Sequence, residues 1–156
     1  MKPLAIVTAG PASEPIDDVR RITNSATGEI GAMLAAELVA RGFEVVLLRG
    51  RGATCTAAPP QAAVHEFTGN HDLARLLEEL SAARADDTRA VFHAAALSDY
   101  AVTAVRGPSG APAHESKIPG DLARVEIVLQ PAAKVLPRLH GWFPRARITA
   151  WKYELD

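Results

Sequence analysis

Hydrophobic positions occur along the chain in two alternating kinds of pattern. Short continuous apolar runs at residues 4–8, 43–48, 63–67 and 90–95 predict buried strands. Between the first two runs, apolar residues recur at three- and four-residue spacing. This predicts a helix that begins at Ser25 and ends at Gly42, with an apolar face of Ile30, Met33, Leu34, Leu38 and Val39. A second helix, capped by Asn70, is predicted to bury Leu73, Leu76, Leu77 and Leu80.

The remaining segments are more polar or more broken. Residues 11–24 contain two prolines and predict a loop with one helical turn. Residues 101–120 have no periodicity, and a loop of that length in a compact domain is typically functional or mobile. Three further elements are predicted after it: a strand at 125–129, a helix at 132–139 and a strand at 148–153.

Strands and helices therefore alternate throughout. This order predicts one Rossmann-like α/β domain over residues 1–156, a three-layer fold whose parallel sheet carries helices on both faces. Seventeen basic and eighteen acidic residues leave a formal charge of -1, so we expect no broad attraction to nucleic acid or membranes. No apolar run is long enough for a leader or a membrane span, and Cys55 is the single cysteine, so we expect a cytoplasmic protein.

Candidate chemistry lies where predicted strands end, because ligands of open α/β sheets bind beyond the carboxyl ends of the strands. Gly10 follows the first strand, and Ala94, Ala95, Ala96 and Asp99 follow or end the fourth. Asp99 is a carboxylate that can hold a metal, a ribose or an amide. A turn-capping role is equally open for it.

Three other features have both a functional and a structural interpretation. Gly28 and Gly31 open the first long helix, where free N–H groups suit a phosphate, although glycines there also permit tight packing. Asn24 either forms a cap or Asx-turn or offers an uncharged amide to an acyl oxygen. Lys117 is either a solvated loop lysine or a cation that neutralises a phosphoryl group. The five histidines show no metal-binding spacing, and His93 is interpreted as a core residue.

Several segments match one family in one order: VTAGPASEPID (7–17), VRRITNSATGEIG (19–31), VFHAAALSDY (91–100), SKI (116–118), VLQPAAKVL (128–136) and ITAWKYELD (148–156). Together they resemble the phosphopantothenoylcysteine synthetases, the synthetase half of the DNA/pantothenate metabolism flavoproteins. The resemblance implies a cytoplasmic, dimeric ligase of coenzyme A biosynthesis. Such an enzyme uses CTP and Mg²⁺ to convert 4'-phosphopantothenate to an acyl-cytidylate, and cysteine then attacks to form the amide. No flavin is expected.

The resemblance also implies roles for individual residues. Lys117 matches the lysine needed for acyl-cytidylate formation, and Asn24 matches the asparagine that holds the acyl intermediate. Substrate contacts fall on Asn24, Ala95, Ala96 and Asp99. Nucleotide contacts fall on Gly10, Gly28, Gly31, Ala94, Asp99, Lys117, Gln130 and Trp151. The metal ligands are not assigned.

The chain departs from the family pattern at several positions. Four positions that usually favour cations hold other residues: Ser13, Glu29, Ala101 and Pro119. Ala26, Gln130 and Trp151 replace a serine, an asparagine and a phenylalanine, and we expect the domain to be truncated at its C-terminus relative to the family. Two alternatives therefore stay open: a divergent, non-catalytic ligand-binding relative, and a short-chain NAD(P)-dependent reductase. The reductase would need glycines directly after the first strand and a Tyr-x-x-x-Lys pair, which Tyr100 does not begin.

Overall fold

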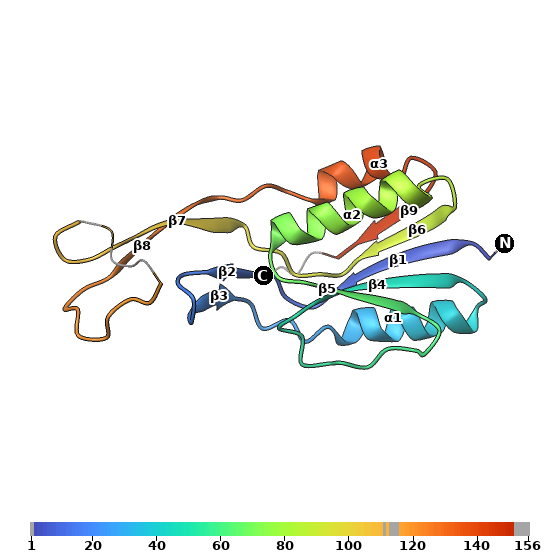
Figure 1. Ribbon diagram of the computed structural model, residues 1–156. Coiled ribbons are helices and arrows are strands. Elements are labelled where there is room, and N and C mark those ends of the chain that lie inside the picture. Colours follow the sequence, from blue (N-terminus) through green and yellow to red (C-terminus); the bar gives the residue numbers. More distant parts are fainter. Residues whose placement is uncertain (1, 111, 113–115, 152–156) are drawn as a thin grey trace, which may run out of the picture.

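The computed structural model describes residues 2–110, 112 and 116–151. Its centre is a five-stranded sheet in the order β5-β4-β1-β6-β9 (Figure 1). The strands span Leu4–Ala9 (β1), Glu44–Gly50 (β4), Ala63–Phe67 (β5), Thr88–His93 (β6) and Arg147–Ala150 (β9). Every neighbouring pair in this sheet is parallel, which confirms the predicted sheet type.

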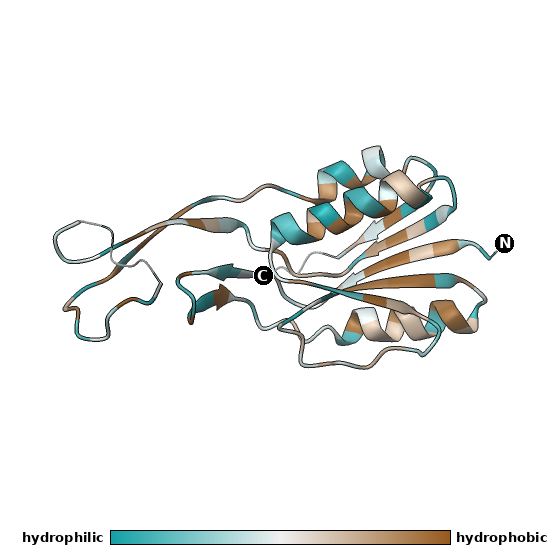
Figure 2. Cartoon of the chain, viewed as in Figure 1, coloured by the Kyte–Doolittle hydropathy of each residue, from teal (hydrophilic) through white to brown (hydrophobic). Residues whose placement is uncertain are grey.

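Helices cover both faces of the sheet. α1 (Glu29–Ala40) lies on one face, and α2 (Asn70–Arg84) and α3 (Leu139–Trp142) lie on the other (Figure 1). Successive side chains of a strand point to opposite faces, so β1 serves both cores. Leu4 and Ile6 pack in the core that includes α2 and α3, whereas Ala5 and Val7 pack in the core that includes α1. Figure 2 shows the apolar strands between the helical layers. The three-layer architecture is therefore confirmed.

The buried face of α1 differs from the predicted one. Ile30 and Met33 are exposed, and the buried residues are Gly31, Ala32, Ala35 and Leu38. A Cβ atom on Gly31 would lie 2.2 Å from the Cβ of Ala9, so the helix approaches β1 more closely than a larger side chain would allow. Small residues, not the largest apolar ones, decide which side of this helix meets the sheet.

Two antiparallel pairs lie outside the central sheet and correct the sequence-based prediction. β2 (Ser13–Pro15) and β3 (Arg21–Thr23) form a hairpin where a helical turn was expected. β7 (Tyr100–Arg106) occupies the start of the expected 101–120 loop and pairs with β8 (Glu126–Pro131). The strand expected at 125–129 thus belongs to this pair and not to the central sheet. The β7–β8 pair extends away from the sheet as an arm (Figure 1).

Three smaller corrections concern element ends. The helix expected at 132–139 is a short 3-10 helix, η1 (Leu136–Arg138), followed by α3, because Pro137 fits only the first turn of a helix. Gly69, in an extended conformation, is the N-cap of α2, so Asn70 is a helical residue and not the cap. The last strand ends at Ala150, and residues 152–153 of the expected strand lie outside the described residues.

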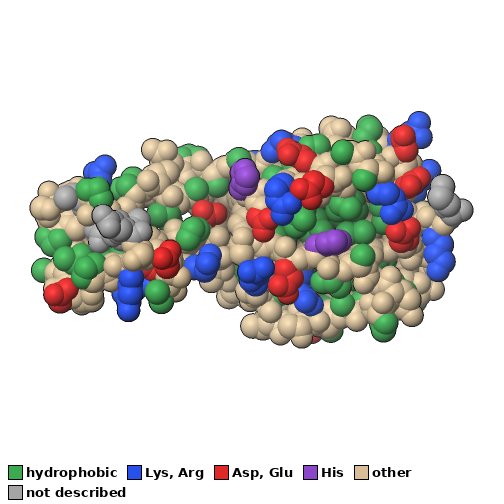
Figure 3. Space-filling view, viewed as in Figure 1, with side chains coloured by type: hydrophobic (Ala, Val, Ile, Leu, Met, Phe, Trp, Pro, Cys, Tyr) green, Lys and Arg blue, Asp and Glu red, His purple; other side chains and the backbone are tan. Residues whose placement is uncertain are grey.

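The surface shows no broad region of one charge on the face drawn in Figure 3, where acidic and basic side chains are interspersed over the globular part. Many of these charges form ion pairs, such as the pair between Arg84 and Glu44. Among the described residues, no helix is long and apolar enough to cross a membrane.

Candidate functional site

The candidate site lies at the point where the strand order of the central sheet reverses. β4 follows β1 on one side, whereas β6 and β9 lie on the other, so the carboxyl ends of β1 and β6 form the switch point at which α/β folds bind ligands. The loops after these two strands, residues 8–12 and 93–96, are here called the β1/β6 mouth. They are joined by backbone hydrogen bonds: Ala96 N–H donates to Gly10 O at 2.9 Å, and Ala12 N–H donates to Ala96 O at 2.9 Å.

A buried side-chain pair supports the mouth from below. Thr8 Oγ1 lies 2.8 Å from His93 Nδ1 and accepts the Ala95 N–H at 3.1 Å. This arrangement suits a neutral imidazole whose Nδ1 accepts the hydroxyl proton. Burial lowers the pKa of His93 to about 4, so the ring is neutral at physiological pH. His93 is therefore a core residue with a satisfied partner, as the sequence predicted, and that partner, Thr8, accepts the Ala95 N–H.

Asn24 lies against the same mouth. Its Nδ2 donates to Ala96 O at 2.8 Å, and its Oδ1 accepts the Ala26 N–H at 3.1 Å, which forms an Asx-turn. Asn24 is nonetheless exposed. The Asx-turn offered by the sequence is therefore confirmed, whereas the contact of Asn24 with an acyl oxygen stays a prediction.

The two helix-opening glycines have different environments. Gly28, the N-cap of α1, has a φ of 86°, and a Cβ there would lie 3.5 Å from the Cα of Gly10 and 3.1 Å from the Cβ of Ala53. Gly28 therefore lies directly beside Gly10 of the mouth. Gly31 is buried against β1, so packing explains it fully. Its predicted nucleotide contact stays a prediction that this burial does not favour.

Asp99 lies at the base of the arm and pairs with Lys134, a cation that the sequence patterns did not single out. Its carbonyl oxygen accepts the Ala132 N–H at 2.9 Å. Asn70 orders the same segment, since its amide donates to Ser98 O at 2.8 Å and accepts the Ser98 N–H at 3.1 Å. Sequence reasoning missed this role because Asn at the start of a helix is expected to cap it.

Lys117 is exposed, and its neighbours are held by the hairpin. Ile118 N–H donates to Asp17 Oδ2 at 3.0 Å, and Asp18 N–H donates to Ser116 O at 2.9 Å. Asp17 is buried, and its carboxylate was also missed by sequence reasoning, because nothing in a polar loop sequence marks one acid as buried.

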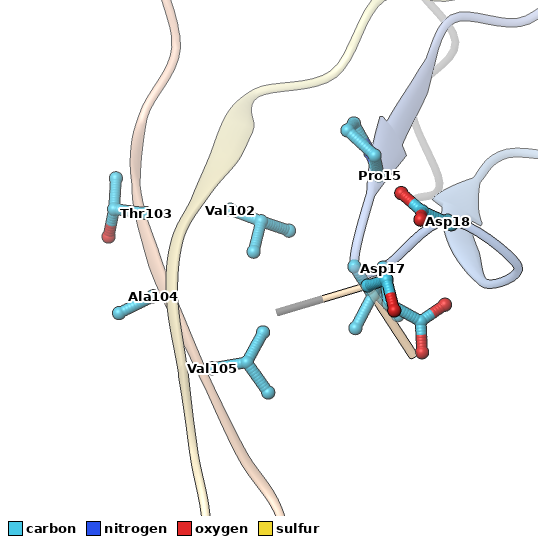
Figure 4. Close-up of a pocket in the computed structure, with 9 residues that line it drawn as sticks. Pro15, Asp17, Asp18, Val102, Thr103, Ala104 and Val105 are labelled. Carbon is cyan, nitrogen blue, oxygen red and sulfur yellow. The ribbon is translucent and has the colours of Figure 1, made fainter. Parts of the chain in front are cut away.

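The hairpin turn also borders the arm. Pro15, Asp17 and Asp18 face β7 across a hollow of about 280 Å³. Figure 4 shows Val102 and Val105 pointing from β7 toward the turn, whereas Thr103 and Ala104 point away. Two residues three apart share this face because the β7–β8 register shifts between Val102 and Ala104. The hairpin thus lies between the mouth and the arm.

The remaining predicted residues lie further apart. Gln130 is exposed on β8, paired in register with Ala101 of β7. Trp151 follows β9, and its ring lies 6.4 Å from that of Phe92 on β6. The structure therefore brings Gly10, Asn24, Gly28 and the segment 94–96 together. Asp99 and Gln130 lie on the arm or at its base, and Lys117 lies beside the hairpin turn.

Three comparisons relate the chain to known proteins. The family model "DNA/pantothenate metabolism flavoprotein C-terminal domain" matches residues 3–136. The coenzyme A biosynthesis bifunctional protein CoaBC of Thermococcus kodakarensis is 30% identical over 152 residues, covering 96% of this chain. Its counterpart from Mycolicibacterium smegmatis is 34% identical over 146 residues, covering 92% of this chain. The chain spans about a third of the length of these relatives (34% and 33%).

Solved structures share the fold. The DNA/pantothenate metabolism flavoprotein from Streptococcus pneumoniae superposes with a TM-score of 0.79 at 27% identity, covering 94% of this chain and 67% of that one. A Cab2 mutant in complex with phosphopantothenate-cysteine superposes with a TM-score of 0.70 at 20% identity, covering 99% and 65%. At that identity the second match supports the fold alone.

The family model spans residues 3–136, which include Gly10, Asn24, the segment 94–96 and Asp99, and the two relatives align with more than nine tenths of this chain. This chain belongs to the family of the DNA/pantothenate metabolism flavoprotein C-terminal domain.

Proposed function

We propose that the chain is a phosphopantothenate–cysteine ligase of coenzyme A biosynthesis. In the proposed reaction, a carboxylate oxygen of 4'-phosphopantothenate attacks the α-phosphorus of CTP, and pyrophosphate leaves. The amine of cysteine then attacks the acyl carbon, the new amide loses a proton, and CMP leaves. The family assignment supports this class of reaction, because the matched relatives are named coenzyme A biosynthesis proteins.

The observation that carries the proposal is the meeting of Asn24 and Ala96 at the β1/β6 mouth. A carboxylate becomes a good electrophile only when its oxygen is turned into a phosphate leaving group. The acyl carbon must then be presented to an amine in a fixed geometry. Asn24 is already oriented by two hydrogen bonds and is uncharged, so it can bind an acyl oxygen without acting as a competing base.

Cations supply the electrostatic part of the proposed reaction. A phosphoryl group in transfer carries developing charge that positioned cations stabilise. Lys117 takes that role in our proposal, and Lys134 adds a positive charge beside Asp99. Mg²⁺ is held in many enzymes by one or two carboxylates together with the substrate's phosphates. Among the described residues, no three His, Cys, Asp or Glu side chains form a metal site, so we propose that Mg²⁺ arrives with CTP and meets Asp99.

We also propose a homodimer formed through the arm. Apolar side chains along β8 and just before it are unusually exposed for an extended element: Val125, Ile127 and Leu129 are 38%, 38% and 44% exposed. An apolar ribbon that extends from the globular part is an expected subunit contact, because a second copy would cover it.

A non-catalytic ligand-binding role is a second candidate that one feature favours. Glu29 stands in the first turn of α1, where its negative charge repels the triphosphate that the helix terminus would attract. The segment 94–96 and Asn24 would still bind acyl ligands in such a protein.

Pyrophosphate release with CTP, Mg²⁺, 4'-phosphopantothenate and cysteine separates the two candidates. For the ligase we expect equal amounts of pyrophosphate, CMP and amide, and a rate lowered roughly a hundredfold by Lys117→Ala. Lys2→Ala is the matched control, because Lys2 is exposed and precedes β1, at the opposite edge of the sheet. Absence of pyrophosphate with CTP and with ATP would contradict the ligase and support the non-catalytic candidate.

A further inference from the structure

Asp17 has an environment that only a carboxylate fits. Its side chain is fully buried, and each oxygen accepts two hydrogen bonds. Oδ1 accepts the N–H groups of Val19 and Arg20 at 2.8 and 2.6 Å. Oδ2 accepts Arg20 Nη1 at 3.0 Å and Ile118 N–H at 3.0 Å. All four partners are donors, and a carboxylate is the side chain that accepts at both ends.

These hydrogen bonds favour the ionised form. Although burial opposes ionisation, the N–H groups of Ile118, Val19 and Arg20 and the Arg20 guanidinium lower the pKa of Asp17 to about 2. A buried charge is stable only when paired and hydrogen-bonded in this way. Asp17 therefore stays charged over the whole physiological range.

The two oxygens serve different purposes. Oδ1 closes the local turn of the hairpin, over two and three residues. Oδ2 reaches a segment 101 residues away in sequence. Two other contacts join the same parts: Asp18 N–H donates to Ser116 O at 2.9 Å, and Arg20 Nη1 lies 3.3 Å from Ile118 O. We call these three long-range contacts the latch.

The latch lies on both sides of Lys117 in the sequence, since its hydrogen bonds are made with residues 116 and 118. The other end of the hairpin is fixed to the β1/β6 mouth. Thr23 Oγ1 donates to Ala12 O at 2.9 Å, and Asn24 donates to Ala96 O at 2.8 Å. If these contacts served only to stabilise the hairpin turn, neither the latch to residues 116 and 118 nor the contacts to Ala12 and Ala96 would be needed. The hairpin therefore links the backbone around Lys117 to the residue that faces the end of β6.

We propose that Asp17 is a positioning residue, which holds residues 116–118 in a fixed position relative to the β1/β6 mouth through the buried latch. This inference rests on the proposed function in assigning Lys117 to the reaction. Its structural half, the anchoring of residues 116–118 by Asp17, stands apart from any activity.

Asp17→Asn tests the latch with the least disturbance. The amide keeps an oxygen for the turn but places an NH₂ group where Oδ2 accepted Ile118 N–H and Arg20 Nη1, so the Asp17 contact of the latch is lost. Asp18→Asn is the matched control, because it removes the same charge one residue later from an exposed side chain. Amide hydrogen exchange reports on the anchoring. We expect the Ile118 N–H to exchange about tenfold faster in Asp17→Asn and at the wild-type rate in Asp18→Asn.

Activity gives the second readout. Asp17→Asn should lower kcat about tenfold with a smaller change in KM, and it should cause no further loss when combined with Lys117→Ala. An equal loss in both backgrounds, or unchanged exchange at Ile118, overturns the proposal.

If no form of the protein is active, the proposed function fails while the exchange result still decides the latch. If Asp17→Asn does not fold, Arg20→Met replaces it in the exchange measurement, since the Arg20 side chain is 42% exposed and its loss breaks one latch contact. Unchanged exchange in that variant overturns the proposal as well.

Discussion

The buried His93 makes the stability of this protein pH-dependent in a calculable way. Its imidazole is 7% exposed, lies 2.8 Å from Thr8 Oγ1 and has a pKa lowered by burial from 6.5 to about 4. In the unfolded chain the ring binds a proton near pH 6.5, whereas in the folded chain it binds one only near pH 4. Between these values the unfolded state holds more protons, so the free energy of unfolding falls as the pH falls.

The magnitude follows from the two pKa values. The linkage relation gives a loss of about 2 kcal/mol from pH 7 to pH 5 and about 3 kcal/mol near pH 4. That is a large part of the total stability of a domain of this size, which is roughly 5–15 kcal/mol. The contribution is fully present above the unfolded pKa of 6.5 and is lost progressively below it.

His93→Asn isolates the effect. An asparagine keeps an acceptor for the Thr8 hydroxyl but does not titrate, so any packing loss shifts its curve equally at every pH. Urea unfolding followed by Trp142 and Trp151 fluorescence from pH 7.5 to 4.5 gives both curves. We expect the wild type to lose about 2 kcal/mol more than the variant between pH 7 and pH 5. Parallel curves would refute the burial of a neutral imidazole at this position.

Two further substitutions test how the site is supported. Gly31→Ala should lower the free energy of unfolding by about 1–3 kcal/mol, because the new Cβ meets the Cβ of Ala9, as thermal unfolding can measure. Gly141→Ala, in α3 with open space around it, should leave stability unchanged or raise it by less than about 1 kcal/mol; a similar loss in both variants would contradict the packing explanation. Asn70→Ala should cost about 1–3 kcal/mol and loosen the segment before Asp99, because both backbone groups of Ser98 lose their partner. Unchanged amide exchange at Ser98 would show that the Asn70 hydrogen bonds are not needed to order this segment.

The central sheet was predictable because β1 is buried at every residue and β4 at most of its residues. Continuous apolar runs such as those at 4–8 and 90–95 are typical of interior strands of a parallel sheet when such runs alternate with predicted helices along the chain. The position of the candidate site was derived from the same prediction, since parallel strands place their carboxyl ends at one edge.

The arm was not predictable by that logic. β8 alternates between half-buried and exposed positions, so its apolar residues resemble a strand of the main sheet in sequence while lying outside it. In β7 a register shift next to Thr103 breaks the period-two pattern, which is why the segment resembled a loop. The rotation of α1 was misjudged for a different reason, because Gly31 and Ala35 let the backbone approach the sheet while Ile30 and Met33 face outward.

Residues that act through long-range contacts were also hidden from the sequence. The predicted Asn24 role depends on a partner, Ala96, that lies 72 residues away, and the Asp17 latch closes over a longer separation still. Residue type and spacing along the chain do not predict such long-range hydrogen bonds. The motifs marked several segments that the fold brings together, and the fold supplied the connections between them.

Mapping of amide chemical shifts during titration with CTP and Mg²⁺ tests the location of the site most directly, because it needs no turnover. We predict saturable shifts at Gly10, Asn24, Gly28 and the amides of 94–96. The amides of Glu44 and Thr88, at the starts of β4 and β6 on the opposite edge of the sheet, should remain unchanged. Saturable shifts confined to other parts of the chain, or none at the β1/β6 mouth at millimolar nucleotide, would contradict a ligase site at that edge.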